Sequence, residues 1–348
     1  MITKESFSNE WIQKQRKKYP KADPKLIERQ IYAFEIVGLL VKSRNIFVFK
    51  GGTSLLLLLP IAHRLSIDVD VVGDFSFDEL ISISKESVFV RIEEDERQES
   101  NIPKKHFKFF YLSNIDERES YVLLDVLYSE HGYPKLLKLP LKCSIFQVDE
   151  NLSVNAPTID GILGDKLTAY APNTIGVPFG KRKSMEIIKQ LFDIGELFDA
   201  CDDLSEISAS YKAIKEQECK YRTNVYTLED VLHDTIETSF LLCQSRLKGS
   251  IDNKNIQELH QGIKQIQSYL LGATYRIEEA RLCAAKAAFV ATVIMNKKEN
   301  IDLKEIRYTD SKIQDIATTT LDGKYSILNK LKAIQTEMFY YWSLISQL

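Results

Sequence analysis

Hydrophobic and polar positions repeat with two different periods along this chain, and the period changes near residue 155. Before that point, short apolar runs with a period of two predict strands. These runs are Phe47–Phe49, Arg64–Val72, Val88–Glu93, Phe107–Leu112, Tyr121–Tyr128 and Leu141–Phe146. Polar connections separate the three runs between residues 88 and 128, which is typical of an antiparallel meander.

Apolar positions spaced three and four residues apart predict helices. One helix begins at Pro24 behind an Asp23 cap, and shorter ones are expected at 53–59 and 77–85. Beyond residue 155 nearly every segment has this spacing: 161–170, 181–199, 228–247, 253–271, 275–295 and 324–345. The pattern predicts an α+β fold with a mixed-sheet core over residues 1–155 and a helical lobe over residues 156–348.

Composition narrows the functional classes. The formal net charge is −3, so any nucleic-acid contact would depend on local basic patches. The five cysteines include no CxxC pair, which disfavours both a disulfide framework and a zinc site. No signal peptide is visible, and the apolar segment 280–295 is too short to span a bilayer. We therefore expect a cytoplasmic protein with no membrane partner.

The segment from Phe47 to Val72 carries the strongest chemical signal. Gly51 and Gly52 follow a buried strand and precede a helix that Thr53 and Ser54 open. Adjacent glycines allow a sharp turn and a close approach of the backbone to a ligand. A helix N-terminus presents free N–H groups and a positive dipole end. This order of elements predicts a binding site for phosphate groups.

Two carboxylates follow on the next predicted strand. The period of two places Ser66, Asp68 and Asp70 on one face. Neighbouring carboxylates repel each other unless a cation lies between them, and hard oxygen ligands suit Mg²⁺ bound to nucleotide phosphates. Asp125 is a third acidic residue, inside an apolar strand, where it requires a partner or a metal.

Each of these features also has a structural explanation. A Gly-Gly pair is often only a tight turn, an Asp-x-Asp pair is often solvated, and Asp125 could be satisfied by an arginine. His63 has no evident chemical role, and we interpret it as structural. The succession of strand, glycines, helix and acidic strand favours function over these alternatives.

The motifs KGGTSL at 50–55 and RLSIDVD at 64–70 resemble the signature of the AbiEii/AbiGii toxin family. Its members are bacterial nucleotidyltransferases of the DNA polymerase β-like superfamily, found in abortive-infection and toxin–antitoxin operons. The resemblance implies that Asp68, Asp70 and Asp125 hold Mg²⁺ or Mn²⁺, with Asp125 on a strand beside the Asp-x-Asp strand. The nucleotide would be bound by the residues around the glycines and the next strand: Lys50, Gly51, Gly52, Thr53, Ser54, Arg64 and Ser66.

The resemblance also implies a functional lysine and aspartate in the helical lobe, which fall on Lys166 and Asp193. The lysine would direct a positive charge at a phosphate, and the aspartate would position the nucleotide or the lysine. The alternatives are structural: Lys166 as a surface residue of its helix, and Asp193 in an i,i+4 pair with Lys189. The helical lobe is expected to complete a cleft with the core.

The acceptor of the nucleotide is the open question at this stage. The resemblance favours an NTP as donor and the tRNA 3′ end as acceptor, with a cognate antitoxin encoded nearby that forms no stable complex. A protein or a small molecule such as an antibiotic is an alternative acceptor. A non-catalytic nucleotide-binding module is a further alternative, which the three retained carboxylates disfavour.

Overall fold

The computed structural model describes residues 1–95, 102–222, 225–272 and 274–348. The chain forms two compact units. The first comprises Met1–Thr158 together with Gln267–Thr274, and the second comprises Ile159–Ile266 together with Tyr275–Leu348. The segment Gln267–Thr274 therefore returns to the first unit from within the helical half of the sequence.

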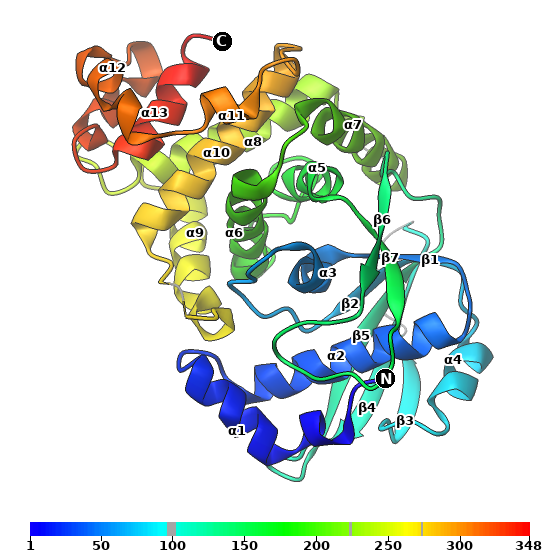
Figure 1. Ribbon diagram of the computed structural model, residues 1–348. Coiled ribbons are helices and arrows are strands. Elements are labelled where there is room, and N and C mark those ends of the chain that lie inside the picture. The colour runs from blue at the N-terminus through cyan, green and yellow to red at the C-terminus, as the bar shows by residue number, and fades with distance from the viewer. Residues whose placement is uncertain (96–101, 223–224, 273) are drawn as a thin grey trace. The chain divides into compact units, whose positions relative to one another are not determined.

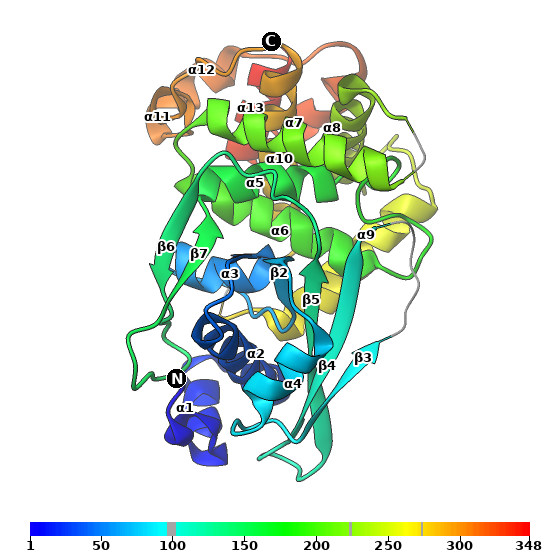
Figure 2. The ribbon, with the colours of Figure 1, turned by 90° about the vertical axis from the view of Figure 1, so that its right-hand side faces the viewer.

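A mixed five-stranded sheet forms the centre of the first unit (Figure 2), and with its helices it confirms the predicted α+β class. The strand order is β1-β2-β5-β4-β3, in which β2 and β5 are parallel and all other neighbours are antiparallel. The strands are β1 (Phe47–Lys50), β2 (Val69–Gly73), β3 (Arg91–Asp95), β4 (Lys104–Leu112) and β5 (Glu119–Leu127). A separate pair consists of β6 (Leu136–Pro140) and β7 (Ser153–Pro157).

Four α-helices accompany these strands in the described part of the first unit: α1 (Asn9–Lys18), α2 (Pro24–Lys42), α3 (Gly51–Leu58) and α4 (Phe77–Ser84). A short 3-10 helix, Lys4–Phe7, precedes them. The predicted cap of α2 is confirmed, because the Asp23 side chain accepts a hydrogen bond from the backbone N–H of Lys25. Helix α2 packs against β2 and β5 (Figure 1).

The period of two in the long strands separates a buried face from a more open face. On β4, Phe107, Phe109 and Tyr111 are buried, and on β5 alternate residues between 122 and 126 are buried in the same way. The buried face packs on α2, where the ring of Tyr32 stacks on Tyr111 with 3.6 Å between centroids. The polar side chains of β4 and β5 therefore lie on the opposite face of the sheet.

The predicted strand Arg64–Val72 is too long at its start, since β2 begins at Val69. The preceding residues pair instead with the returning segment. The N–H of Leu65 donates to the carbonyl of Tyr269, and the N–H of Leu271 donates to the carbonyl of His63. A partner remote in sequence thus takes the backbone hydrogen bonds that a sheet neighbour would have taken.

The prediction of a strand over Leu141–Phe146 is wrong. This segment is irregular, and a turn in which the N–H of Lys142 donates to the carbonyl of Pro140 starts it. Its apolar side chains are buried in the core without strand geometry. The strands in this region are β6 and β7, whose short sequences gave no strand prediction. Part of the polar connection predicted before β4, at 96–101, lies outside the described residues.

The second unit is helical in its described part, as the sequence predicts. Its α-helices are α5 (Ile159–Ala169), α6 (Ser184–Ala200), α7 (Leu204–Tyr221), α8 (Leu228–Gln244), α9 (Lys254–Gln265), α10 (Ile277–Met295), α11 (Leu303–Ile306), α12 (Ile313–Thr318) and α13 (Thr336–Ile345). Its 3-10 segments include Asp310–Lys312 and Gly323–Leu331, and a further one, Ile266–Tyr269, spans the boundary between the units. No helix in the described ranges is apolar over enough residues to cross a membrane.

The single helix predicted over 324–345 is wrong, because a 3-10 helix ending at Leu331 and α13 are separate elements. The carbonyl of Leu331 accepts from the N–H groups of both Ile334 and Gln335. This turn closes the first element, and the extended φ of −137° at Gln335 prevents continuation. The aromatic residues 339–342 of α13 are buried, which confirms their interpretation as core.

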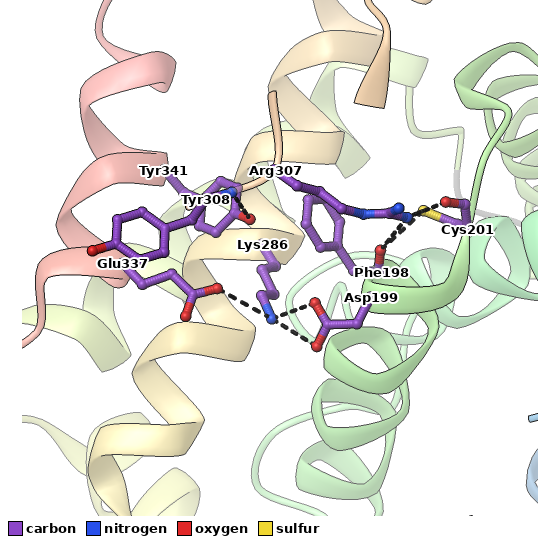
Figure 3. Close-up of polar contacts among 8 residues, drawn as sticks. All are labelled: Phe198, Asp199, Cys201, Lys286, Arg307, Tyr308, Glu337 and Tyr341. Atoms are coloured by element: carbon purple, nitrogen blue, oxygen red, sulfur yellow. Dashed lines mark hydrogen bonds and ion pairs between the residues drawn. The ribbon is translucent and has the colours of Figure 1, made fainter. Parts of the chain in front are cut away.

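A buried lysine joins three helices of the second unit (Figure 3). Lys286 on α10 has a side chain only 5% exposed, and its Nζ lies 2.6 Å and 2.9 Å from the carboxylate oxygens of Asp199 on α6. Glu337 on α13 lies 3.7 Å away. Burial opposes the charge of Lys286, but Asp199 raises its pKa above the ordinary value. The ion pairs therefore link α6, α10 and α13 through one side chain.

Glu35 gives the first unit a distinctive pH dependence. This residue of α2 is 5% exposed and accepts a hydrogen bond of 3.2 Å from the N–H of Ile2. Burial raises its pKa from 4.5 to about 7. Between these values the folded state binds more protons at Glu35 than the unfolded state does, so this contribution to stability is lost as pH rises towards 7.

We expect Glu35→Gln to be more stable than the parent at pH 8, by up to about 3 kcal/mol, and similar to it near pH 4.5. The glutamine keeps an acceptor for Ile2 and has no charge to bury. Chemical unfolding at the two pH values measures the difference. The exposed Glu10→Gln is the control and should show no such pH-dependent gain. An equal effect of Glu35→Gln at both pH values would contradict the prediction.

Candidate active site

Strand β1 runs directly into α3, and Gly51 stands at the junction. Its φ of +76° lies in the left-handed region, which favours glycine. A Cβ at this position would come within 2.3 Å of Oδ2 of Asp70. The first glycine of the motif is therefore required by both its conformation and its contact with a predicted catalytic carboxylate.

Gly52 has equally close neighbours on its other side. A Cβ there would lie 2.6 Å from Nη2 of Arg64 and 2.7 Å from Oγ of Ser66. Arg64 is buried, and its Nη1 donates to the carbonyl of Leu65 at 2.9 Å. The structure thus brings a guanidinium group and a hydroxyl to the N-terminus of α3, where the backbone N–H groups and the helix dipole also favour an anion.

The hydroxyls of Thr53 and Ser54 are buried and donate to backbone carbonyls. Thr53 Oγ1 donates to the carbonyl of Asp68 at 2.5 Å, and Ser54 Oγ donates to that of Gly51 at 2.8 Å. In this arrangement both side chains stabilise the local backbone, and Thr53 holds the residue that begins the acidic pair. A direct contact of either hydroxyl with a phosphate stays a prediction.

One row of polar residues crosses all five strands of the sheet at the same level. Lys50 is the register partner of Asp70, Asp70 of Asp125, Asp125 of His106, and His106 of Asp95. Register partners project from the same face of a sheet, here the face opposite α2. The expected placement of Asp125 beside the Asp-x-Asp strand is confirmed, while its catalytic role stays a prediction.

A second lysine completes the centre of this row. Nζ of Lys104 lies 2.5 Å from Oδ2 of Asp125 and 3.8 Å from Oδ1 of Asp70. Nδ1 of His106 donates to the other oxygen of Asp125 at 2.6 Å. Burial alone would raise the pKa of Asp125, but His106 and Lys104 hold it below its ordinary value. Burial likewise would lower the pKa of Lys104, but Asp70 and Asp125 raise it.

Asp68 differs from the other two carboxylates. It is exposed and precedes β2, so the prediction that it lies on the same strand as Asp70 is wrong. Within the described ranges, no group of three or more His, Cys, Asp or Glu side chains is arranged to hold a metal ion. The structure brings Asp70 and Asp125 together directly and leaves Asp68 two residues before Asp70.

The Asp70–Asp125 pair nevertheless suits a cation, because it already accommodates the ammonium group of Lys104. Carboxylate oxygens are the ligands that Mg²⁺ and Mn²⁺ prefer. Sequence reasoning missed Lys104 and His106. The available signal was the alternation of polar and aromatic residues along 104–111, which places both side chains on the open face.

We predict that Lys104 and a divalent cation compete for the same two carboxylates. Lys104→Met should lower the thermal midpoint in EDTA, because the carboxylates lose their counter-charge. Added Mn²⁺ should then raise the midpoint of the variant more than that of the parent. Lys105→Met is the matched control, since Lys105 is half exposed and pairs with Glu94 at 2.9 Å. An Mn²⁺ shift equal to that of the parent would argue against competition.

Lys166 and Asp193 belong to the second unit, on α5 and α6. Nζ of Lys166 lies 2.9 Å from Oδ2 of Asp193 and donates to Oε1 of Gln190 at 3.0 Å. Their side chains are 8% and 1% exposed. The alternative of Lys166 as a surface residue is therefore wrong, and the structure brings together the lysine and aspartate that the family resemblance paired.

Comparisons with known proteins place the chain in a family. The family model for the nucleotidyl transferase AbiEii toxin of type IV toxin–antitoxin systems matches residues 39–268. The matched range includes the glycines, Asp68, Asp70, Asp125, Lys166 and Asp193. No curated protein sequence matches the chain significantly.

Several solved structures are similar to the chain at low sequence identity. JHP933 from Helicobacter pylori is 14% identical with a TM-score of 0.44, and the match covers 78% of this chain and 94% of that one. A second H. pylori protein is 16% identical, with a TM-score of 0.43 and coverages of 81% and 99%. An antigenic nucleotidyltransferase-like protein from Paracoccidioides brasiliensis is 14% identical, with a TM-score of 0.36 and coverages of 60% and 93%.

The family match spans well over half of the chain and includes every motif residue described above. Membership implies a nucleotidyltransferase enzyme with a nucleotide substrate and an antitoxin partner. The chain belongs to the AbiEii family of nucleotidyltransferase toxins of type IV toxin–antitoxin systems.

Proposed function

We propose that this enzyme transfers a nucleoside monophosphate from an NTP to the 3′-terminal hydroxyl of tRNA. The observation that carries the transfer chemistry is the adjacency of Asp70 and Asp125 beside the glycine-opened helix α3. The N–H groups at the start of α3 and the guanidinium of Arg64 would bind the triphosphate. Lys50, in register with Asp70, adds a positive charge on the same face.

Asp70 and Asp125 would hold Mg²⁺, and Asp68, which the structure does not bring into the same strand register, stays the third ligand that the family resemblance implies. When bound, the metal would neutralise negative charge on the triphosphate and lower the pKa of the attacking hydroxyl. The acceptor oxygen attacks the α-phosphorus, the bond to the bridging oxygen breaks, and pyrophosphate leaves. Asp125, oriented by His106, would take the proton of the hydroxyl. For Lys166 and Asp193 the proposed role stays the one that the family resemblance implies, a lysine charge oriented by the aspartate, which lies 2.9 Å away.

A feature of the open sheet face favours a nucleic acid over a small-molecule acceptor. Phe110 and Tyr121 are register partners on the face that carries Asp125, with 5.6 Å between ring centroids. Arg91 lies over the first ring at 3.5 Å, and Lys108 lies over the second at 5.5 Å. Paired aromatic rings with cations above them suit the stacking of unpaired bases.

The acceptor is tested by incubating the purified protein with each α-labelled NTP, Mg²⁺ and total tRNA, followed by a denaturing gel. We expect label on tRNA that disappears with Asp70→Ala and weakens with Tyr121→Ala. Metal-dependent NTP binding without labelled tRNA would refute the tRNA acceptor and direct the search to protein and small-molecule acceptors. The protein should form no stable complex with its antitoxin, which co-purification would test.

A further inference from the structure

The second unit contains a hollow of about 500 Å³ between α9 and the turn that follows α8. Gln257, His260, Gln261 and Lys264 line one side, and their spacing of three and four residues places them on a single face of α9. Arg246, from the turn, lines the other side. None of these residues belongs to the site described above.

A chain of hydrogen bonds fixes the imidazole of His260, which lines this hollow. Nε of Arg246 donates to Nδ1 of His260 at 3.2 Å. Because that nitrogen accepts, the ring proton lies on Nε2, which faces Oγ of the buried Ser245 at 3.1 Å. Oγ of Ser245 in turn donates to the carbonyl of Leu242 at 2.8 Å. The imidazole is therefore neutral and holds the guanidinium in place.

The charges around the ring support this assignment. Burial lowers the pKa of His260, and Arg246, Arg281 and Lys264 lower it further. Arg246 and Lys264 form no ion pair with a carboxylate among the described residues. Asp252 also lines the hollow, and among the described residues its carboxylate forms no ion pair with a lysine or an arginine. Two cations and the carboxylate of Asp252 thus line a hollow in which His260 carries no charge.

The backbone of Arg246 adds an independent observation. Its φ of +63° lies in the left-handed region, directly after the C-cap residue Ser245 of α8. Glycine is the usual residue at that place, because a side chain there strains the backbone. Arg246 holds this conformation while its guanidinium is hydrogen-bonded to His260 beside the hollow.

We infer that this hollow binds a phosphate group carried by a nucleotide or a nucleic-acid strand. Arg246 would bind the phosphate with its free guanidinium N–H groups, and Lys264 would add a second charge. The volume exceeds that of a phosphate ion, and the amides of Gln257 and Gln261 offer hydrogen bonds to a sugar or a base. The inference depends on residues of the second unit alone and does not require the proposed transfer reaction.

Calorimetric titration of the full chain in EDTA tests this site, with inorganic phosphate, AMP and a single-stranded uridine hexanucleotide as probes. Arg246→Gly should weaken binding by about tenfold or more, while its thermal midpoint should be no lower than that of the parent because glycine relieves the positive φ. Lys264→Gln should weaken binding as well. Repeating the titrations in chains that also carry Gly51→Ala removes the contribution of the first unit.

Lys297→Gly is the matched control, since Lys297 is an exposed cation with a φ of +54° that does not line the hollow. Its binding should equal that of the parent. If the two variants weaken binding of the hexanucleotide but not of AMP, the phosphate is that of a nucleic-acid strand. If they weaken binding of AMP but not of the hexanucleotide, it is that of a free nucleotide. Absence of binding by the parent, or equal binding by parent, Arg246→Gly and Lys264→Gln, would overturn the inference.

Discussion

Replacement of Asp70 by asparagine is expected to reduce nucleotide transfer at least about a thousandfold while the protein stays folded. Asp70 lies between Lys50 and Asp125 in the row across the sheet and faces the Cα of Gly51. Asparagine has nearly the same shape but cannot supply the charge that attracts a divalent cation. Lys104 would still have Asp125 as its partner at 2.5 Å. The measurement is initial rate under saturating Mg²⁺, with circular dichroism to verify folding.

Asp95→Asn provides the matched control for this prediction. Asp95 lies in the same polar row, on the edge strand β3, and pairs with Lys108 at 3.1 Å. Replacing this carboxylate by an amide removes one negative charge from the same face of the sheet without changing the Asp70–Asp125 pair. We expect its rate to stay within a few-fold of the parent. If Asp70→Asn retained the activity of Asp95→Asn, the assignment of Asp70 as a catalytic residue would fail.

Substitution of Gly51 by alanine is expected to lower activity by about a hundredfold or more, through a steric effect on Asp70. The new methyl group would lie at the position that is 2.3 Å from Oδ2 of Asp70 and 2.9 Å from its Cγ. The carboxylate must therefore move, and displacement of a reacting group by an ångström costs about that factor. The ratio of kcat to KM for the NTP is the quantity to measure.

Gly180→Ala separates this steric effect from backbone strain. Gly180 has the same φ of +76°, but an added Cβ would meet nothing within 4 Å. Both alanine variants should lose about 1 kcal/mol of stability from the left-handed conformation. Only Gly51→Ala should lose activity. Equal activity of the two variants would show that Gly51 is needed only for the turn.

The local order of the catalytic segment could be predicted because each step has its own residue signal. A buried apolar strand, two glycines and a leucine-rich helix follow one another within 47–59. The pairing of Asp70 with Asp125 could be inferred only from the family resemblance. Register between strands that are more than fifty residues apart depends on long-range packing, which a single sequence does not display.

The incorrect strand predictions and the missed lysine also result from long-range packing that a single sequence does not display. The start of β2 was misplaced because Leu65 pairs with Tyr269, a contact that no local periodicity encodes. The segment 141–146 is apolar enough for a strand but is buried as irregular chain. Lys104 was missed because a lysine near a strand end is usually solvated, and its carboxylate partners become neighbours only when β4, β5 and β2 pair.

The return of Gln267–Thr274 to the first unit has a consequence for synthesis on the ribosome. Arg64 lies against Gly52, and the backbone on either side of Arg64 is hydrogen-bonded to Tyr269 and Leu271. A growing chain therefore cannot complete the backbone hydrogen bonds on either side of Arg64 until translation has passed this segment. A fragment that ends between Asp193 and Gln267 would contain all four aspartates of the candidate site and lack the two backbone hydrogen bonds that flank Arg64.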